Sequence, residues 1–324
     1  GAMGDEVVVD HAATKRYAVV TGANKGIGFE ICKQLASKGI TVILASRDEK
    51  RGIEARERLI KELGSEFGDY VVSQQLDVAD PASVAALVDF IKTKFGSLDI
   101  LVNNAGLNGT YMEGDASVLN DYVEAEFKTF QSGAAKTEPY HPKATGRLVE
   151  TVEHAKECIE TNYYGSKRVT EALIPLLQQS DSPRIVNVSS TLSSLVFQTN
   201  EWAKGVFSSE EGLTEEKLEE VLAEFLKDFI DGKQQEKQWP PHFSAYKVSK
   251  AALNAYTRII AKKYPSFRIN AVCPGYTKTD LSYGHGQFTD AEAAEAPVKL
   301  ALLPQGGPSG CFFFRDEAFC LYLE

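Results

Sequence analysis

Short apolar runs alternate with longer amphipathic segments along the first third of the chain, and this alternation constrains the fold more than any other feature. Residues 16–21, 41–45, 70–78 and 98–103 are four apolar runs that each end in a turn. The segments between them have helical periodicity and roughly a dozen residues each. Strands separated by such helices form right-handed βαβ units. The sequence therefore predicts an α/β fold with a doubly wound parallel sheet.

The same alternation continues beyond residue 150. We expect helices over residues 152–177 and 245–263, and strands over 184–189, 267–272 and 311–314. Because no linker, repeat or low-complexity tract divides the chain, we predict one domain.

Two long interruptions and a short tail complete this organisation. The interruptions, residues 107–150 and 195–243, are predicted insertions, and the second contains a charged helix near residues 214–229. The domain is expected to span residues 15–315. Residues 1–14 lack periodicity and begin with an apparent tag remnant, so they are predicted to be a disordered tail.

Composition excludes several classes of function. The 324 residues carry a net charge of −10, which argues against nucleic acid or an anionic membrane as the main partner. No apolar run approaches the roughly 18 residues of a membrane span. The five cysteines are scattered, as in reduced cytoplasmic proteins, and the five histidines show no metal-ligand spacing. We therefore expect a cytoplasmic protein with no metal site.

A glycine-rich stretch follows the first predicted strand and precedes the first helix. Gly22, Gly26 and Gly28 leave room for a pyrophosphate, while the helix start supplies N–H groups and a positive dipole. Their spacing is looser than the usual dinucleotide fingerprint, but their place between strand and helix supports it. We predict a nucleotide site here that also includes Asn24, Lys25 and Ile27.

The type of nucleotide should be set at the end of the second strand. An acidic residue there would bind the ribose of NAD(H), whereas this chain has Arg47, whose guanidinium suits a 2′-phosphate. Lys25 can add a second positive charge, although Asp48 weakens the argument. The chain is therefore predicted to bind NADPH/NADP+. Further candidate contacts follow the third and fourth strands: Asp77, Val78, Asn104, Ala105 and Gly106.

Two tyrosine–lysine pairs have the spacing of one helical turn: Tyr246 with Lys250, and Tyr163 with Lys167. Residues four apart lie on the same helix face. A nearby ammonium favours the phenolate, so the lysine is expected to lower the pKa of the tyrosine. Such a phenol can exchange a proton with a carbonyl oxygen. Spacing alone does not decide which pair has this role.

Four motifs in order resemble the short-chain dehydrogenase/reductase family: residues 21–28, 103–106, 188–190, and Tyr246 with Lys250. The resemblance covers residues 15–315 and implies a Rossmann-type fold. It also favours Tyr246 over Tyr163, since the family's active tyrosine lies on the helix after the fifth strand.

The resemblance implies specific roles for individual residues. Tyr246 would be the general acid, Lys250 would lower its pKa and hold the nicotinamide ribose, and Ser190 would bind the substrate oxygen. Asn162 would hold a water molecule that connects Lys250 to solvent. The turn that binds the nicotinamide end would contain Pro274, Gly275, Thr277 and Thr279.

Further similarity to a plant branch of this family, which acts on alkaloid and mint monoterpenoid ketones, appears in residues 22–32, 200–206, 239–242 and 306–311. It implies NADPH-dependent reduction of a small apolar cyclic ketone such as menthone or isomenthone to a neomenthol-type alcohol. Four apolar residues near the catalytic serine and tyrosine could line the pocket, or simply pack in the core: Leu192, Leu195, Phe197 and Phe243.

Several alternatives remain open. The same fold could reduce the C=C bond of a cyclic enone such as isopiperitenone, although Tyr246 favours the ketone, or it could reduce an alkaloid ketone. A non-catalytic NADP(H) sensor is a third possibility. The second insertion resembles one that covers the usual oligomer surface in monomeric carbonyl reductases, so we predict a monomer.

Overall fold

The computed structural model describes residues 15–134, 140–142, 145–275 and 287–319. Its main sheet has the order β10-β9-β8-β7-β4-β1-β2-β3. The strands of this sheet are β1 (Tyr17–Val20), β2 (Thr41–Ser46), β3 (Val71–Gln75), β4 (Ile100–Asn103), β7 (Arg184–Val188), β8 (Arg268–Cys273), β9 (Phe312–Phe314) and β10 (Glu317–Phe319). Strands β1, β2, β3, β4, β7, β8 and β9 are parallel, and β10 pairs antiparallel with β9. The predicted doubly wound parallel sheet is confirmed.

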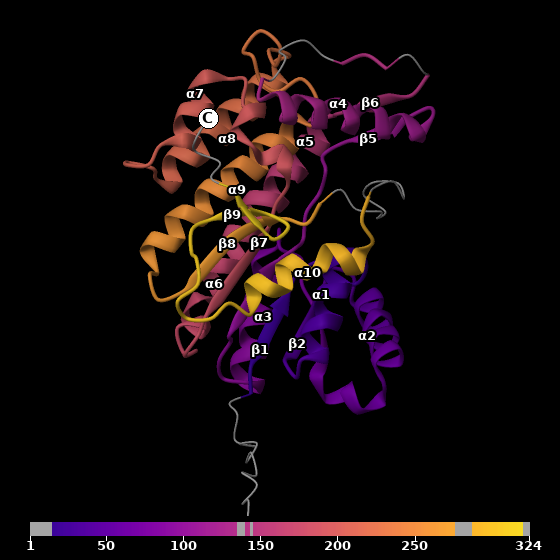
Figure 1. Cartoon of the computed structure of the whole chain (residues 1–324), viewed down its shortest axis with the longest axis vertical. Coiled ribbons are helices and arrows are strands. Elements are labelled where there is room, and N and C mark those ends of the chain that lie inside the picture. Colours follow the sequence, from indigo (N-terminus) through magenta and orange to yellow (C-terminus); the bar gives the residue numbers. More distant parts are fainter. Residues whose placement is uncertain (1–14, 135–139, 143–144, 276–286, 320–324) are drawn as a thin grey trace, which may run out of the picture.

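Helices cover both faces of this sheet, because the strands are apolar on both sides. Strand β2, for example, is buried at every position. One apolar core contains residues of α1 (Gly26–Ser37), α2 (Glu49–Leu63) and α10 (Asp290–Ala301). The core on the opposite face contains residues of α3 (Pro81–Lys94), α5 (Val152–Ile159), α6 (Ser166–Leu177) and α9 (Ser244–Lys263). Figure 1 shows the resulting three layers.

The chain reverses its direction of winding at β1 and β4, which are neighbours in the sheet. From β1 the chain proceeds through β2 to β3 on one side, and from β4 through β7 to β8 on the other. Ligands of open α/β sheets bind beyond the carboxyl ends of the strands at this switch point. The residues after Val20 and after Asn103 are therefore placed where a ligand is expected.

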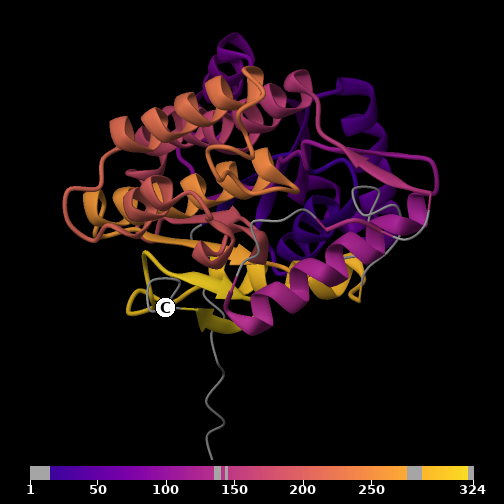
Figure 2. The ribbon, with the colours of Figure 1, turned by 90° about the horizontal axis from the view of Figure 1, so that it is seen from above.

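The two predicted insertions contain regular elements. Residues 107–150, for which the sequence predicted an insertion without defined elements, contain β5 (Tyr111–Glu113), α4 (Leu119–Ser132) and β6 (Arg147–Val149), with β5 and β6 paired antiparallel. The second insertion contains α7 (Glu201–Ser208) and α8 (Glu215–Ile230). Figures 1 and 2 show α4 apart from the sheet, along one side of the molecule.

Several predicted boundaries differ from the structure; the strand expected over residues 70–78, for example, ends at Gln75. The single helix expected over residues 152–177 is interrupted by a π-helical turn, Glu160–Gly165, between α5 and α6. The predicted end at Leu177 is confirmed, although Pro175 lies inside the last turn of α6. The helix continues past Pro175 because Leu176 and Leu177 are buried, and tertiary packing outweighs local preference.

Candidate active site

The glycine-rich turn connects β1 to α1 and is tightly packed against the start of the next loop. A Cβ atom on Gly22 would lie 2.8 Å from Ala105 Cα, and Gly22 has a φ of +59°. A Cβ on Gly28 would lie 2.7 Å from the Gly22 carbonyl oxygen. Side chains at these positions would therefore fill the surface beside the helix N-terminus. The turn fits a pyrophosphate in the predicted manner.

Asn104 and Thr21 join this turn to the end of β4. The Thr21 hydroxyl accepts the N–H groups of Asn104 and Ala105, each at 2.9 Å. The Asn104 side chain in turn donates to the carbonyl oxygens of Thr21 and Gly22 at 3.2 and 3.1 Å. These hydrogen bonds join the ends of β1 and β4 at the switch point. The nucleotide cradle that the two ends form is therefore preorganised.

The remaining predicted nucleotide contacts surround this cradle. Arg47 and Lys25 are exposed, and the Arg47 backbone accepts a hydrogen bond from Gln75. One oxygen of the Asp77 carboxylate accepts the Ala79 N–H, so this side chain stabilises its own turn. Asn24 and Ile27 lie in the turn, and Ile27 also lines the central cavity. Val78 is buried, and its carbonyl oxygen accepts from Arg168.

Alanine at position 28 is expected to weaken binding of the dinucleotide by about tenfold or more, because overpacking costs about 1–3 kcal/mol. The new Cβ would lie 2.9 Å from Ala23 Cα and 2.7 Å from the Gly22 oxygen, both backbone atoms. Gly205→Ala is the matched control, since its Cβ meets nothing within 4 Å on α7. Cofactor fluorescence titration of both variants checks the difference. Equal affinities of the two variants for the dinucleotide would show that the space around Gly28 does not limit cofactor binding.

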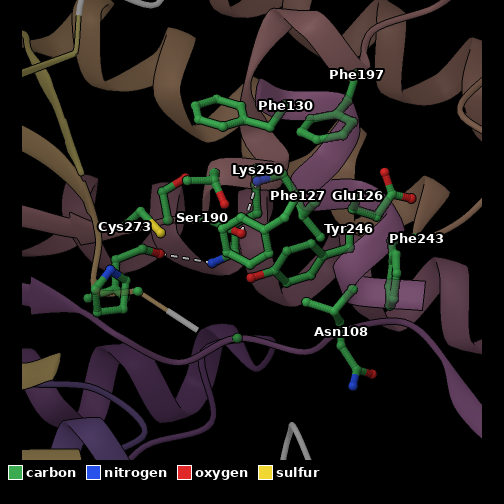
Figure 3. A pocket seen from close by; sticks show the side chains of 18 of the residues that line it. Asn108, Glu126, Phe127, Phe130, Ser190, Phe197, Phe243, Tyr246, Lys250 and Cys273 are labelled. Carbon is green, nitrogen blue, oxygen red and sulfur yellow. Dashed lines mark hydrogen bonds between the residues drawn. The ribbon is translucent and has the colours of Figure 1, made fainter. Parts of the chain in front are cut away.

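Ser190, Tyr246 and Lys250 converge at the end of β7 and on the first turns of α9 (Figure 3). The Lys250 ammonium donates to the Val188 carbonyl oxygen at 2.9 Å and lies 5.8 Å from the centroid of the Tyr246 ring. The Ser190 hydroxyl accepts the Leu192 N–H at 3.1 Å and hydrogen-bonds the Tyr246 side chain. The structure brings these three predicted residues together.

The electrostatics of the pair differ from the prediction. Burial raises the pKa of Tyr246 above its usual range, and the hydrogen bond from Ser190 only partly opposes this effect. Burial also lowers the pKa of Lys250 to about 8. The expectation that the lysine sets the pKa of the tyrosine is wrong here, because desolvation of both groups outweighs their coupling. Tyr246 is therefore held in its protonated form.

Asn162 lies in the π-helical turn and is fully buried. Its side chain donates to the Leu107 carbonyl oxygen at 2.9 Å and to the Ser249 hydroxyl at 3.1 Å, and it accepts the Leu107 N–H at 2.8 Å. A Cβ on Gly106 would lie 3.3 Å from both the Asn162 amide oxygen and the Lys250 ammonium. Asn162 thus adjoins Lys250 across Gly106. π-Helical turns often mark functional sites.

The second tyrosine–lysine pair does not form a site. Tyr163 is fully buried, and its hydroxyl has no hydrogen-bond partner among the described residues. The Lys167 ammonium instead lies 3.1 Å from Glu219 and 3.4 Å from Glu215, both on α8. Lys167 therefore connects α6 to the second insertion, and its spacing from Tyr163 is coincidental.

A cavity of about 220 Å³ extends from the nucleotide cradle past Ser190 and Tyr246. Of the four predicted pocket residues, Leu192, Phe197 and Phe243 line it. Leu195 packs in the core instead, where it is 6% exposed. Pro274 and Gly275 also line this cavity, whereas Thr277 and Thr279 lie outside the described residues.

One wall of this cavity comes from α4, in the insertion for which no structure was predicted. The wall residues are Leu119, Val123, Glu126, Phe127 and Phe130. Their apolar members recur at helical spacing, which is the signal that could have identified the helix. Between α4 and the Ser190–Tyr246 pair the cavity is mostly apolar, with the two hydroxyls at one edge (Figure 3).

Neither a metal site nor a membrane span emerges from the described parts of the chain. They contain no group of three His, Cys, Asp or Glu residues that could hold a metal ion. None of their helices is long and apolar enough to cross a membrane.

The fold, the glycine cradle and the Ser190–Tyr246–Lys250 cluster together define the class of protein: the chain belongs to the short-chain dehydrogenase/reductase family, and it is an oxidoreductase of the type that uses a nicotinamide cofactor. The family model described as short chain dehydrogenase matches residues 16–152, and one described as enoyl-(acyl carrier protein) reductase matches residues 233–307.

Plant monoterpenoid enzymes are among its close relatives. The solved structure of menthone neomenthol reductase from Mentha piperita is 95% identical, covers 94% of this chain and 100% of that chain, and has a TM-score of 0.89. The (-)-isopiperitenone reductase of the same plant is 64% identical over 96% of this chain and all of the relative. The (+)-neomenthol dehydrogenase of Capsicum annuum is 54% identical over 96% of this chain and 99% of the relative.

Proposed function

We propose that this chain reduces a small apolar cyclic ketone with NADPH, and that menthone and isomenthone are substrates that become neomenthol-type alcohols. The supporting observation is the position of the Ser190 and Tyr246 hydroxyls at the edge of an apolar cavity that continues into the nucleotide cradle. A ketone held there can turn its oxygen toward both hydroxyls while its hydrocarbon ring contacts α4. The 95% identity to menthone neomenthol reductase supports the choice of ketone.

In this proposal the bound cofactor supplies the hydride, and the protein positions the ketone and supplies the proton. Tyr246 donates its proton to the carbonyl oxygen, which its raised pKa favours because the phenol stays protonated. Ser190 donates a hydrogen bond to the same oxygen as negative charge develops on it. Lys250, adjacent to Asn162, would hold the nicotinamide ribose.

We propose NADPH over NADH because two cations lie at the adenosine end of the cradle. Arg47 follows β2 and Lys25 precedes α1, and both are exposed. A guanidinium can pair with a phosphate through two hydrogen bonds. The other residues proposed to contact the cofactor are Gly22, Asn24, Gly26, Ile27, Gly28, Asp77, Val78, Asn104, Ala105, Gly106, Tyr246, Pro274, Gly275, Thr277 and Thr279.

A second candidate reaction is reduction of the conjugated C=C bond of a cyclic enone. The 64% identity to (-)-isopiperitenone reductase favours it. Reduction of that bond requires no proton at the carbonyl oxygen from Tyr246, whereas ketone reduction does. Because Tyr246 and Ser190 are both present at the cavity, we rank ketone reduction first.

The test is incubation of the purified protein with NADPH and menthone or isomenthone, followed by chiral gas chromatography. We expect neomenthol-type alcohols in amounts equal to the NADPH consumed. Absence of any alcohol from either ketone would contradict the proposal.

We further propose a cytoplasmic monomer. The described cysteines Cys32, Cys158, Cys273 and Cys311 are free thiols. Helix α8 of the second insertion packs against α9, as expected if this insertion covers the surface that the resemblance to monomeric carbonyl reductases implies. Sedimentation velocity is expected to give a single species near 35.5 kDa, and a dimer or tetramer would contradict this assignment.

A further inference from the structure

Glu126 of α4 and Lys247 of α9 form a buried ion pair directly beside the catalytic tyrosine. The Lys247 ammonium lies 2.7 Å from the Glu126 carboxylate, and the two side chains are 2% and 12% exposed. For comparison, Lys128 and Glu124 on α4 pair at 3.8 Å with exposures of 75% and 61%. The pair joins positions 121 residues apart in the sequence. The ion pair thus connects the first insertion to Lys247, which directly follows Tyr246 in α9.

Among the described residues, apolar and aromatic contacts hold both ends of α4. A small apolar cluster, separate from the two main cores, holds the beginning of the helix; its buried members are Val118, Leu119, Tyr122 and Phe243. Further along, Phe130 stacks on Phe197 with centroids 6.5 Å apart, and Lys247 lies 4.8 Å above the same Phe197 ring. The ion pair therefore anchors the middle of α4, between these apolar contacts.

The ion pair also separates two cavities. Glu126 and Phe197 line the active-site cavity, and together with Lys247 they line a second cavity of about 640 Å³ on the far side. That second cavity has charged and polar side chains among its lining residues, including Asp121, Glu124 and His242. If α4 moved away from α9, the apolar cavity would open toward this larger space.

We propose that the Glu126–Lys247 ion pair is a latch that holds α4 against α9 and thereby limits the size of the ketone that the active site accepts. Lys247 is a positioning residue, since it acts through α4 on the substrate. This inference rests on the proposed ketone reduction for its effect on specificity, but the latch itself is independent of the reaction.

Loss of the lysine should affect α4 because the Glu126 carboxylate would then be buried without its ion-pair partner. Lys247 faces two carboxylates, Glu126 on α4 and Glu150 after β6. Glu150 accepts the Ser244 N–H at 2.7 Å at the start of α9, so it cannot turn away without uncapping that helix. Removing one partner of a buried pair leaves an uncompensated charge, which is costlier than removing both.

The first measurement is hydrogen exchange of α4 in the NADPH-bound protein, which requires no turnover. In Lys247→Met the amides of residues 119–132 should exchange at least about tenfold faster, because an anchored helix opens less often. Lys128→Met is the matched control, since it removes a lysine from an exposed ion pair of the same helix, and should exchange as the wild type does. Unchanged exchange in folded Lys247→Met would overturn the latch.

The second measurement compares menthone with the bulkier 4-phenylcyclohexanone. In Lys247→Met the KM for menthone should rise at least about fivefold with a smaller change in kcat, and the ratio of kcat/KM should shift toward the bulkier ketone. The affinity for NADPH should not change. Glu126→Gln keeps the shape of the side chain and should shift the KM for menthone and the ratio of kcat/KM in the same direction as Lys247→Met, but by less. This variant keeps the test possible if Lys247→Met does not fold.

The outcomes separate the two proposals. If the wild type reduces neither ketone, the proposed function fails, and hydrogen exchange still decides whether the latch exists. If exchange accelerates but the ratio of kcat/KM stays constant, the latch is retained and its role in specificity is overturned. If Lys128→Met has the same effects as Lys247→Met, both parts of the inference are overturned.

Discussion

Replacing Tyr246 by phenylalanine is expected to lower kcat for ketone reduction by about 10²–10⁴-fold, the range that a positioned general acid contributes. The substitution removes only the hydroxyl at the edge of the cavity, next to Ser190. Since the phenol does not belong to the glycine cradle, binding of NADPH should persist. Stopped-flow turnover and cofactor titration on the same preparation measure both quantities.

Tyr163→Phe is the matched control for this experiment. It removes a hydroxyl with the same four-residue spacing from a lysine, but one that is fully buried and has no hydrogen-bond partner among the described residues. Removing an unsatisfied buried hydroxyl is neutral or stabilising, so kcat should be unchanged. If Tyr246→Phe retained full activity, or if Tyr163→Phe lost as much, Tyr246 would not be the proton donor.

Replacing Arg47 by alanine is expected to raise the KM for NADPH by about 10–100-fold, because a hydrogen bond to a charged group contributes about 1.5–3 kcal/mol. The KM for NADH should stay nearly constant, since NADH lacks the 2′-phosphate that the guanidinium would bind. Steady-state kinetics with both cofactors at a saturating ketone concentration provide the comparison.

Arg147→Ala controls for the loss of one positive charge. Arg147 is 70% exposed and pairs with Glu113 in the first insertion, away from β2. It should leave both KM values unchanged. An equal loss with NADPH and NADH in Arg47→Ala would show that Arg47 supports the fold of the turn and not the phosphate.

Local signals were sufficient for most of the sheet and for the glycine turn. The strands are short apolar runs that alternate with segments of helical periodicity. Strand β2 is buried at every position, as its sequence predicts. Tyr246 and Lys250 were candidates because of their one-turn spacing, but only the resemblance to the family favoured them over Tyr163 and Lys167 and added Ser190.

What could not be predicted depends on long-range contacts. Helix α4 was missed although its apolar residues recur at helical spacing, and its contact with Lys247, 121 residues away, has no local signal. The pKa of Tyr246 was predicted in the wrong direction because spacing reveals the neighbouring lysine but not the burial of both groups. The π-helical turn around Asn162 likewise depends on its contacts with Leu107 and Ser249.

Because Tyr246 is proposed to protonate a carbonyl oxygen, a competition experiment that offers the enzyme both reducible bonds tests this role. Isopiperitenone contains a conjugated C=C bond beside its carbonyl, and menthone contains only the carbonyl. With NADPH and both compounds in one vessel, we predict conversion of menthone to an alcohol and no saturated ketone from isopiperitenone. Saturation of the C=C bond with menthone left intact would contradict the claim.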